Sequence, residues 1–510
     1  NPNPTITTAA VKTNVIDAGN NQFSFTTDVL EPLTTYYIRP FTTNQFGTGY
    51  GEVTALTTGE AFVMTIAPTG EFFFPLTGEV VYDLAIGWGD GTTTKINGTH
   101  KNSTNPNPAK HTYQGTETRT IVVYGDFGPF RMNDDPMTAA QKNMVLDISS
   151  WGNATIATSS VFKGATNMTI SAIKPPTVTT TNFDSMFMGC KALNIDLSLW
   201  NVSAVTNFNN AFKDATTYNN GEAPLTWNVA NATTLASMFQ YAYAFNQDIR
   251  GWDVSKVTTM NSMFNSAKAF NNGGQSLAWE NYTSQVKDMR DMFAGTEAFN
   301  QDISGWDVSN VTTMQTMFSA ATAFNNGGKA LSWGSNTRNV TNMYGMFNGA
   351  NAFNQNISSW NVSSVTSMSN MFVNNTAFDN AGQPLDWTSG FGASANLSYM
   401  FYNNNKFNQD ISNWIVSNVT NMGFMFRDNT AFNNGGEKLD WKSGFGPSIN
   451  LSFMFYNNNK FNQDISDWNV SNVTSMHSMF RGAFAFNNGG VSLDWGNNTQ
   501  NVTTMYEMFI

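Results

Sequence analysis

The sequence is poor in the residue types on which most catalytic and metal sites depend. It has one cysteine, Cys190, and three histidines among 510 residues. A single cysteine cannot form an intrachain disulfide or a Cys-rich zinc site. Catalysis needs acid, base or nucleophile groups that converge, yet two of the histidines, His100 and His111, lie far along the chain from His477. We therefore predict that the protein is not an enzyme and has no cofactor.

Positive charge is also scarce. The chain has 25 Lys and Arg against 36 Asp and Glu, a net charge of −11, so it lacks the basic field that binds nucleic acid or anionic lipid. It has no run of eighteen apolar residues and does not begin with the basic and then apolar pattern of a signal peptide. These absences predict a soluble chain with no nucleic-acid partner and no transmembrane segment in this fragment. The lack of an initiating Met and an end inside a repeat suggest a longer natural protein.

A repeat dominates the sequence. A Met-Phe pair or a close variant recurs between positions 161 and 508, and from Met238 onward the spacing alternates between 25 and 29 residues. Trp recurs at a near-constant step of 27 from Trp200 to Trp495. A fixed period of this size is typical of a solenoid, in which each repeat buries its apolar face by stacking on its neighbours. We expect one coil per repeat, with the extra Asn-Asn-Gly-Gly of the longer repeats placed in a loop.

Two segments of each repeat have a local pattern. Asp-Ile-Ser-x-Trp is short, apolar and bounded by turn residues, which predicts one strand of a parallel sheet. Met-x-x-Met-Phe places its apolar residues at i, i+3 and i+4, which predicts one helical or 3₁₀ turn. Asp147 to Trp151 already fits the strand pattern, so the repeats are expected to begin near Asn143.

The segments before the repeats have β-sandwich patterning. Residues 1–59 resemble the later part of a fibronectin type III domain through Leu30, Pro32, Tyr36-Tyr37 and Gly47-Thr48-Gly49-Tyr50-Gly51. Residues 60–135 resemble a polycystic-kidney-disease (PKD) type immunoglobulin-like domain through Trp88-Gly89-Asp90-Gly91-Thr92 and His111-Thr112-Tyr113.

The repeats of residues 143–510 resemble a third family. Residues 299–314 read Phe-Asn-Gln-Asp-Ile-Ser-Gly-Trp-Asp-Val-Ser-Asn-Val-Thr-Thr-Met, which is similar to the BspA-like leucine-rich-repeat surface proteins. The resemblance implies a large bacterial adhesin that is secreted or displayed on the cell surface, often in Bacteroidota with type IX secretion. The predicted fold class is mainly β: two immunoglobulin-like β-sandwich modules followed by a leucine-rich-repeat-type solenoid with one short parallel strand and one helical turn per coil. The solenoid is expected to continue past Ile510.

Several rows of residues recur at one register. Acidic side chains on alternate coils are weak candidates for a cation site, because hard cations prefer oxygen ligands. We favour a turn role, in which each carboxylate accepts nearby backbone amides. A recurring Asn row is expected to form an internal ladder that satisfies backbone groups, and the Trp and Met-Phe rows are expected to form the core. The acidic row consists of Asp248, Asp302, Asp410 and Asp464.

Ligand recognition is expected at positions that recur in every repeat but hold different residues from one repeat to the next. The positions between the two Met residues become rich in aromatic residues toward the C-terminal half, and exposed aromatic rings stack on sugars or anchor a protein partner. The alternative is that these are scattered surface aromatics or are partly buried between coils. The candidates are Tyr344, Tyr399, Phe424, Phe453, His477 and Tyr506.

The preferred hypothesis is an extracellular, cell-surface adhesin fragment that binds a host or bacterial surface protein or a glycan through its repeats, without catalysis. One alternative is a structural spacer, or a filament subunit that associates end to end. Another is a carbohydrate-binding module of a larger secreted enzyme.

Overall fold

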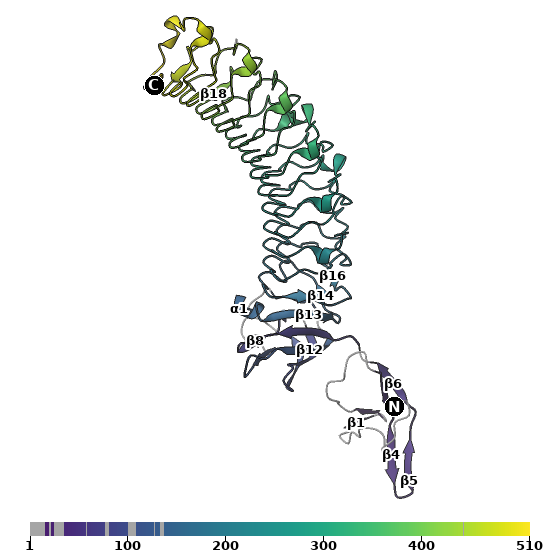
Figure 1. Cartoon of the computed structure of the whole chain (residues 1–510). Helices are drawn as coiled ribbons and strands as arrows, with labels where there is room; N and C mark the ends of the chain where they lie inside the picture. The colour runs from purple at the N-terminus through teal and green to yellow at the C-terminus, as the bar shows by residue number, and fades with distance from the viewer. Residues whose placement is uncertain are drawn as a thin grey trace. The chain divides into compact units, whose positions relative to one another are not determined.

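A computed structural model describes residues 16–19, 22–24, 35–57, 59–76, 81–99, 109–126, 128–132, 137–441 and 443–510. The contacts divide the chain into two compact units, Asn1–Thr179 and Thr180–Ile510. Figure 1 shows that strands make up most of the regular structure of the first unit and that the second is a stack of coils. The expectation of a mainly β repeat protein is met at this level.

The described residues before position 58 form three antiparallel strand pairs. They are β1 (Ile16–Gly19) with β2 (Gln22–Ser24), β3 (Thr35–Ile38) with β6 (Thr54–Thr57), and β4 (Phe41–Asn44) with β5 (Gly47–Tyr50). Along β3, Tyr36 is partly buried and Tyr37 is exposed, as an alternating strand requires. Leu30 and Pro32, on which the resemblance to fibronectin type III also depends, lie outside the described residues.

The rest of the first unit is built on a six-stranded sheet of order β10-β9-β12-β7-β13-β15. Its strands are β7 (Phe62–Ile66), β9 (Val81–Gly87), β10 (Thr93–Thr99), β12 (Arg119–Asp126), β13 (Val145–Trp151) and β15 (Thr169–Ile170). A two-stranded sheet pairs β8 (Glu71–Phe73) with β11 (Lys110–Thr112), and another pairs β14 (Thr155–Ile156) with β16 (Thr177–Val178). The single described α-helix is α1 (Ala139–Lys142), which a capping box at Thr138 begins.

Strand β13 joins the preceding strands of the six-stranded sheet to the first repeat. It pairs antiparallel with β7 and parallel with β15, so the expected strand from Asp147 to Trp151 is confirmed but is part of a mixed sheet. The contact boundary falls between Thr179 and Thr180, whereas the sequence predicts that the repeats begin near Asn143. Continuous hydrogen bonding along the sheet explains the difference, because the first coils pack as part of the preceding sheet.

In the second unit, successive coils pair in parallel at one place per coil. Short strands and single bridges carry this pairing in the Val-Thr-x segment before the first Met. The bridges link positions 182, 207, 234, 259, 288, 313, 342, 367 and 396 in order. The strands are β17 (Ala395–Asn396), β18 (Val419–Asn421), β19 (Ile449–Asn450) and β20 (Val473–Ser475).

The prediction that Asp-Ile-Ser-x-Trp forms the strand is therefore wrong for the second unit, where none of the described segments of this kind is a strand. Side chains occupy the backbone amides that a ladder would need. The amide of Ile303 donates to Asn326 Oδ1 at 2.9 Å, and the amide of Ser304 donates to Asp302 Oδ1 at 2.9 Å. Local side-chain hydrogen bonds of this kind compete with sheet pairing.

The Met-x-x-Met-Phe segment is not a helical turn either. The residue before the Met-Phe pair and the residue four places later are left-handed in successive coils, for example Ser262 at φ 55° and Ser266 at φ 59°, and a right-handed helix cannot contain them. Instead the amides of Ser262, Phe264 and Ser266 donate to carbonyl groups of the next coil at 2.7–2.9 Å. The segment thus links one coil to the next.

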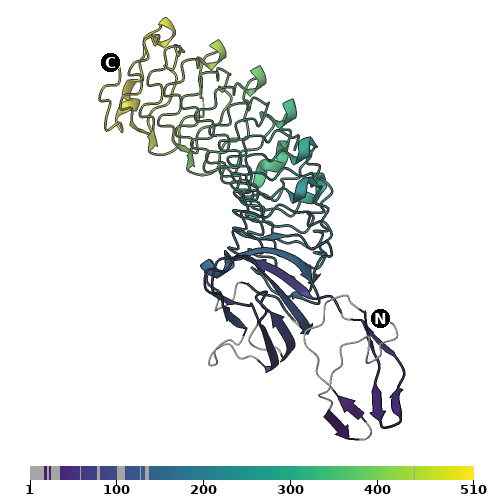
Figure 2. The same cartoon turned by 60° about the horizontal axis from the view of Figure 1, so that its bottom comes forward.

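The described helical segments of the second unit are short 3₁₀-type turns. Most lie at the insertion of the longer repeats, where their residues are left-handed, for example Asn272 at φ 52° and Gly273 at φ 61°. These are η1 (Asn220–Glu222), η2 (Asn272–Gly274), η4 (Asn326–Gly328), η6 (Asn380–Gly382), η7 (Asn434–Gly436) and η8 (Asn488–Gly490), with η3 (Glu280–Thr283), η5 (Gly334–Asn339) and η9 (Gly496–Thr499) after Trp. Figures 1 and 2 show turns following one another along the outer edge of the curved stack.

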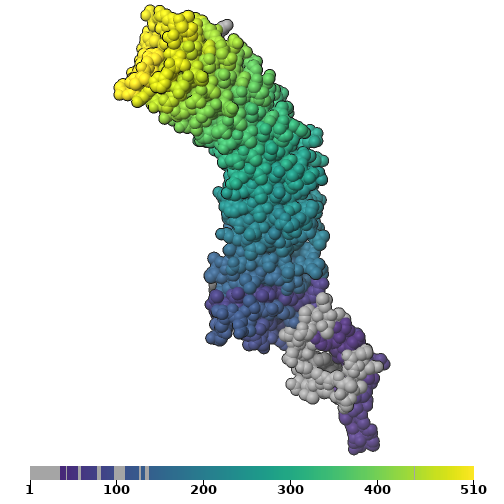
Figure 3. All heavy atoms as spheres, in the orientation of Figure 1, coloured from purple at the N-terminus to yellow at the C-terminus, as the bar shows by residue number. Residues whose placement is uncertain are grey.

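Aromatic rows form the core of the second unit, as expected. Phe264 and Phe270 stack within one coil at 3.8 Å between ring centroids, and Phe264 stacks on Phe293 of the next coil at 5.6 Å. Trp279 stacks on Trp306 at 5.7 Å, and Trp306 Nε1 donates to the Leu277 carbonyl at 3.0 Å. The coils follow one another in sequence order along the surface (Figure 3), because each packs on its neighbours.

Candidate ligand-binding face

The acidic row has the turn role that the sequence favours. Asp248, Asp302, Asp410 and Asp464 each accept the backbone amide two residues later at 2.9–3.0 Å. Asp302 also pairs with Lys329 at 2.9 Å. Burial alone would raise the pKa of Asp302, but hydrogen bonds from Ser304 and Lys329 outweigh it and hold the pKa below the usual value. Within the described residues, no three His, Cys, Asp or Glu side chains gather as a metal site requires.

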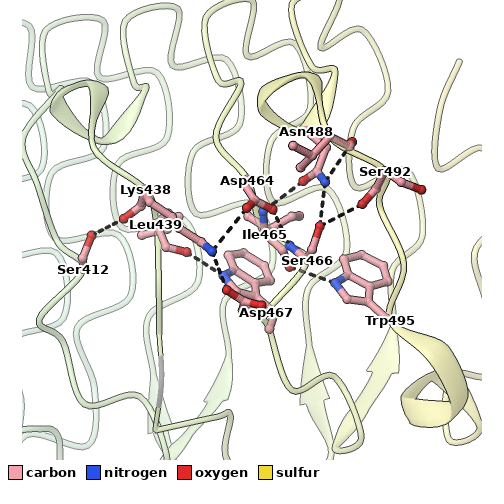
Figure 4. Close-up of polar contacts among 12 residues, drawn as sticks. Ser412, Lys438, Leu439, Asp464, Ile465, Ser466, Asp467, Asn488, Ser492 and Trp495 are labelled. Carbon is pink, nitrogen blue, oxygen red and sulfur yellow. Dashed lines mark hydrogen bonds and ion pairs between the residues drawn. The ribbon is translucent and has the colours of Figure 1, made fainter.

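Figure 4 shows how this row connects neighbouring coils near the C-terminal end. The Lys438 ammonium reaches the carboxylates of Asp464 and Asp467. Asn488 accepts the Ile465 amide at 2.9 Å and donates to Ser466 Oγ at 2.8 Å. The contacts around the acidic row therefore satisfy backbone and turn groups.

The recurring Asn row forms the predicted internal ladder. Asn246 Oδ1 accepts the amides of Asn271 at 2.7 Å and Gly273 at 3.0 Å, and Asn300 Oδ1 accepts the amide of Asn325 at 2.8 Å. The same hydrogen bond repeats along the stack. These side chains therefore connect each coil to the next and are not available to a ligand.

The aromatic candidates behave differently, because five of the six form one continuous column of rings. The members of this ring column are Tyr399, Phe424, Phe453, His477 and Tyr506. Tyr399 and Phe424 lie 4.4 Å apart and within 5° of parallel, and Phe424 and Phe453 lie 4.5 Å apart and within 10°. His477 meets Phe453 edge to face at 4.8 Å and stacks on Tyr506 at 5.4 Å. Tyr399, Phe424, Phe453 and His477 are half-buried, and Tyr506 is exposed.

Three of these rings occupy a strained backbone position. The residue directly before Met-Phe has a positive φ in successive coils, and other coils place a small or polar residue there, such as Asn210, Ser262 or Asn370. Tyr399, Phe424 and Phe453 stand at φ 58°, 64° and 59°. A bulky side chain in this conformation costs about 1–2 kcal/mol, and such strain concentrates at functional sites.

A second row runs beside the ring column and alternates tyrosine with arginine. Its members, two residues after each Met of the Met-Phe pair, are Tyr402, Arg427, Tyr456 and Arg481. The guanidinium carbon of Arg427 lies 4.7 Å from the Tyr456 ring centroid, 5.8 Å from that of Tyr402, 5.6 Å from that of Phe424 and 6.0 Å from that of Phe453. Arg427 is thus surrounded by rings of both rows, as cation–π attraction favours. We call the two rows together the aromatic face.

Acidic partners engage the two arginines unequally. Arg427 Nε donates to Asp428 Oδ2 at 3.2 Å, and Asn457 Nδ2 holds the other oxygen of Asp428 at 2.8 Å. Arg481 uses an Nη group to bind the Glu507 carboxylate.

Sequence reasoning missed the tyrosine and arginine row, although its regular alternation in successive repeats could have revealed it.

Comparison with known families concerns the same coils. Residues 135–225, 222–284, 276–334, 391–487 and 447–510 match the family described as "Mycoplasma protein of unknown function, DUF285", and these segments make up more than half of the chain. The chain belongs to the DUF285 family. No curated protein and no solved structure gives a significant match. The aromatic face lies within the two C-terminal DUF285 segments.

The sixth aromatic candidate, Tyr344, lies outside the DUF285 segments. It is 38% exposed, and one coil, which carries Ser369 and Asn370, separates it from Tyr399. The structure therefore does not bring it into the ring column.

The remaining histidines lie before the DUF285 segments. His100 is outside the described residues. His111 stacks on Trp88 at 5.2 Å and contacts Asp90 Oδ2 at 2.6 Å. Burial pushes the pKa of Asp90 upward, but hydrogen bonds from Thr92 and His111 outweigh it and lower the pKa to about 2.

None of the described helices is long and apolar enough to cross a membrane.

Proposed function

We propose that this DUF285 protein is a non-catalytic binding protein of a bacterial cell surface and that its aromatic face holds the ligand. In this proposal the resemblance to BspA-like leucine-rich-repeat adhesins extends to function. The fibronectin-like and PKD-like segments serve as immunoglobulin-like spacers, and the repeats act as a leucine-rich-repeat-type solenoid that presents the face outside the cell.

The observation that carries the proposal is the aromatic face itself. Tyrosine and arginine are the residue types over-represented where binding energy concentrates in protein interfaces. Elsewhere in the stack the same registers hold small residues such as Ser262, Ala294 and Ser319, so packing between coils does not require rings there. Tyr399, Phe424 and Phe453 stand at a positive φ that small or polar residues occupy in other coils, and strain of this kind concentrates at functional sites.

Non-catalytic binding agrees with the surroundings of the titratable groups. His477 packs between Phe453 and Tyr506, and the acidic row is engaged in turns. Binding by area along a repeat stack needs no convergent acid and base, whereas a hydrolase or transferase would need them.

The test compares the full chain with a triple variant, Tyr399→Asn, Phe424→Asn and Phe453→Asn. Asparagine stands at the same register at Asn210 and Asn370, so the fold should tolerate it. The matched control replaces three exposed rings outside the face, at Tyr243, Tyr282 and Tyr344, with asparagine. Each protein is screened against arrays of surface proteins and glycans.

We expect saturable binding by the full chain and the control, and at least a tenfold loss in the triple variant. Absence of any binding by the full chain, or equal binding by the triple variant, would contradict the proposal. Concentration-dependent assembly without ligand binding would favour the spacer or filament hypothesis instead.

A further inference from the structure

The geometry of the ring column decides what can bind to it. Tyr399, Phe424 and Phe453 stack face to face at 4.4–4.5 Å, so each ring covers the face of the next. Phe453 and His477 meet in a T-shaped contact at 4.8 Å, and Tyr402 meets Tyr399 in another at 5.8 Å. Phe424, which is covered on both faces, and its neighbours Tyr399 and Phe453 therefore offer ring edges to a partner. A sugar needs an open ring face for stacking, whereas apolar and aromatic side chains pack against ring edges.

Arg427 adds a guanidinium at the centre of the face that is engaged through Nε alone among its nitrogens in the described contacts. Its side chain is 31% exposed, and its described polar contact is the one between Nε and Asp428. The two Nη groups make no described hydrogen bond or ion pair. A guanidinium with both Nη groups open binds a carboxylate through two parallel hydrogen bonds. The surrounding rings keep water from its flanks, which strengthens such a bond.

The charge around Arg427 limits the number of anionic groups that the partner presents. Arg481, the other arginine of the face, is already neutralised by Glu507. The chain as a whole carries a net charge of −11, which repels a polyanion such as a sulfated or uronic polysaccharide. One open guanidinium among apolar edges therefore fits one carboxylate flanked by apolar groups.

We infer that the aromatic face binds a protein partner through an Asp or Glu side chain that pairs with the Nη groups of Arg427, while apolar side chains next to that residue pack on the ring edges of Phe424 and Phe453. This inference rests on the proposed function and names the chemistry of its ligand. Asp428 acts as a positioning residue, because it holds Nε and leaves both Nη groups directed to a partner.

The test uses the full chain and a peptide array in which a central Asp, Glu, Asn or Gln is flanked by varied apolar and aromatic residues. Sulfated and uncharged polysaccharides are included as separate probes. The variants are Arg427→Gln, which removes the charge, and Arg427→Lys, which keeps the charge but not the two-pronged geometry. Arg481→Gln is the matched control, because Arg481 already uses an Nη group to bind Glu507, whereas Arg427 binds Asp428 through Nε. Other coils hold Ala294, Ser319 or Asn348 at this register, so the variants should fold, which circular dichroism verifies.

We expect the full chain and Arg481→Gln to prefer acidic over amide peptides by at least tenfold, with a preference that weakens as salt rises. Arg427→Gln should lose the preference, and Arg427→Lys should retain part of it. Equal binding of acidic and amide peptides, an unchanged preference in Arg427→Gln, binding of polysaccharide alone, or no peptide binding would overturn the inference. If surface proteins bind the full chain but not the triple ring variant, and Arg427→Gln has no effect, the inference fails while the proposed function stands.

Discussion

Replacing Asn326 with alanine is expected to destabilise the stack by about 2–4 kcal/mol. Asn326 is completely buried, and its Oδ1 accepts the amide of Ile303, which is also buried. A buried donor left without a partner costs about 1–3 kcal/mol. Asn326 also stands at φ 52°, where alanine lacks the local hydrogen bonding that lets asparagine adopt this conformation, which adds about 1 kcal/mol. The Nδ2 contact to the Lys329 carbonyl at 2.9 Å is lost as well.

The assay is amide hydrogen exchange of the full chain, which measures local opening where a repeat protein does not unfold in one step. A loss of about 2–4 kcal/mol raises the exchange rate at Ile303 by roughly 30- to 1000-fold. Asn281→Ala is the control, because Asn281 is exposed in η3 and such a surface change stays within about 0.5 kcal/mol.

Unchanged exchange at Ile303, or equal effects of the two substitutions, would refute the reasoning. Either result would mean that packing of the Trp and Phe rows holds the coils in register without the buried amide.

Three further predictions concern other parts of the chain. Asp90→Asn should lower stability at neutral pH, by an amount that solvent reduces because Asp90 is exposed. The folded pKa of Asp90 is lowered to about 2, so its contribution is present above pH ~4 and is lost as the pH falls toward 2. Acid titration of thermal unfolding should therefore separate the variant from the parent only above that window. Ala381→Gly should raise stability by about 1 kcal/mol in denaturant unfolding, because Ala381 stands at φ 55° where an L side chain is strained; a decrease would contradict this. Gly446→Ala should destabilise by at least about 2 kcal/mol, since the added Cβ would lie 2.3 Å from a backbone oxygen of the neighbouring coil. Gly251→Ala should be tolerated, because its added Cβ meets nothing within 4 Å. A comparison of the melting temperatures of the two variants tests this prediction.

The spacing of residues predicted what depends on register. A row at a constant step must lie at the same place in every coil, which is why the burial of Trp306 and Phe264, the turn role of Asp302 and the ladder of Asn246 could all be inferred. The ring candidates were found from the two positions between the Met residues of each repeat, because variation there from repeat to repeat indicates a surface that packing leaves free.

The placement of the strands could not be inferred in this way. The Asp-Ile-Ser-x-Trp and Val-Thr-x-Met segments have similar patterns of apolar and polar residues, and they differ in which backbone amides side chains already occupy. Asn326, 23 residues beyond Ile303 in the chain, supplies the group that keeps the Trp segment out of the sheet. Such a contact between coils has no local trace in the sequence.

The sequence by itself determined that the chain is a repeat protein of stacked coils, which residues face the core and which registers are free to vary, because periodicity aligns equivalent positions whatever the path of the backbone. Only the tertiary structure decided how the free registers meet. In that structure three rings of the column belong to left-handed residues. The column continues at His477, although His477 stands one residue earlier in its repeat than Phe453 does. Arg427 lies among four rings from three coils. These relations depend on the direction of side chains between neighbouring coils, which spacing along the chain does not specify.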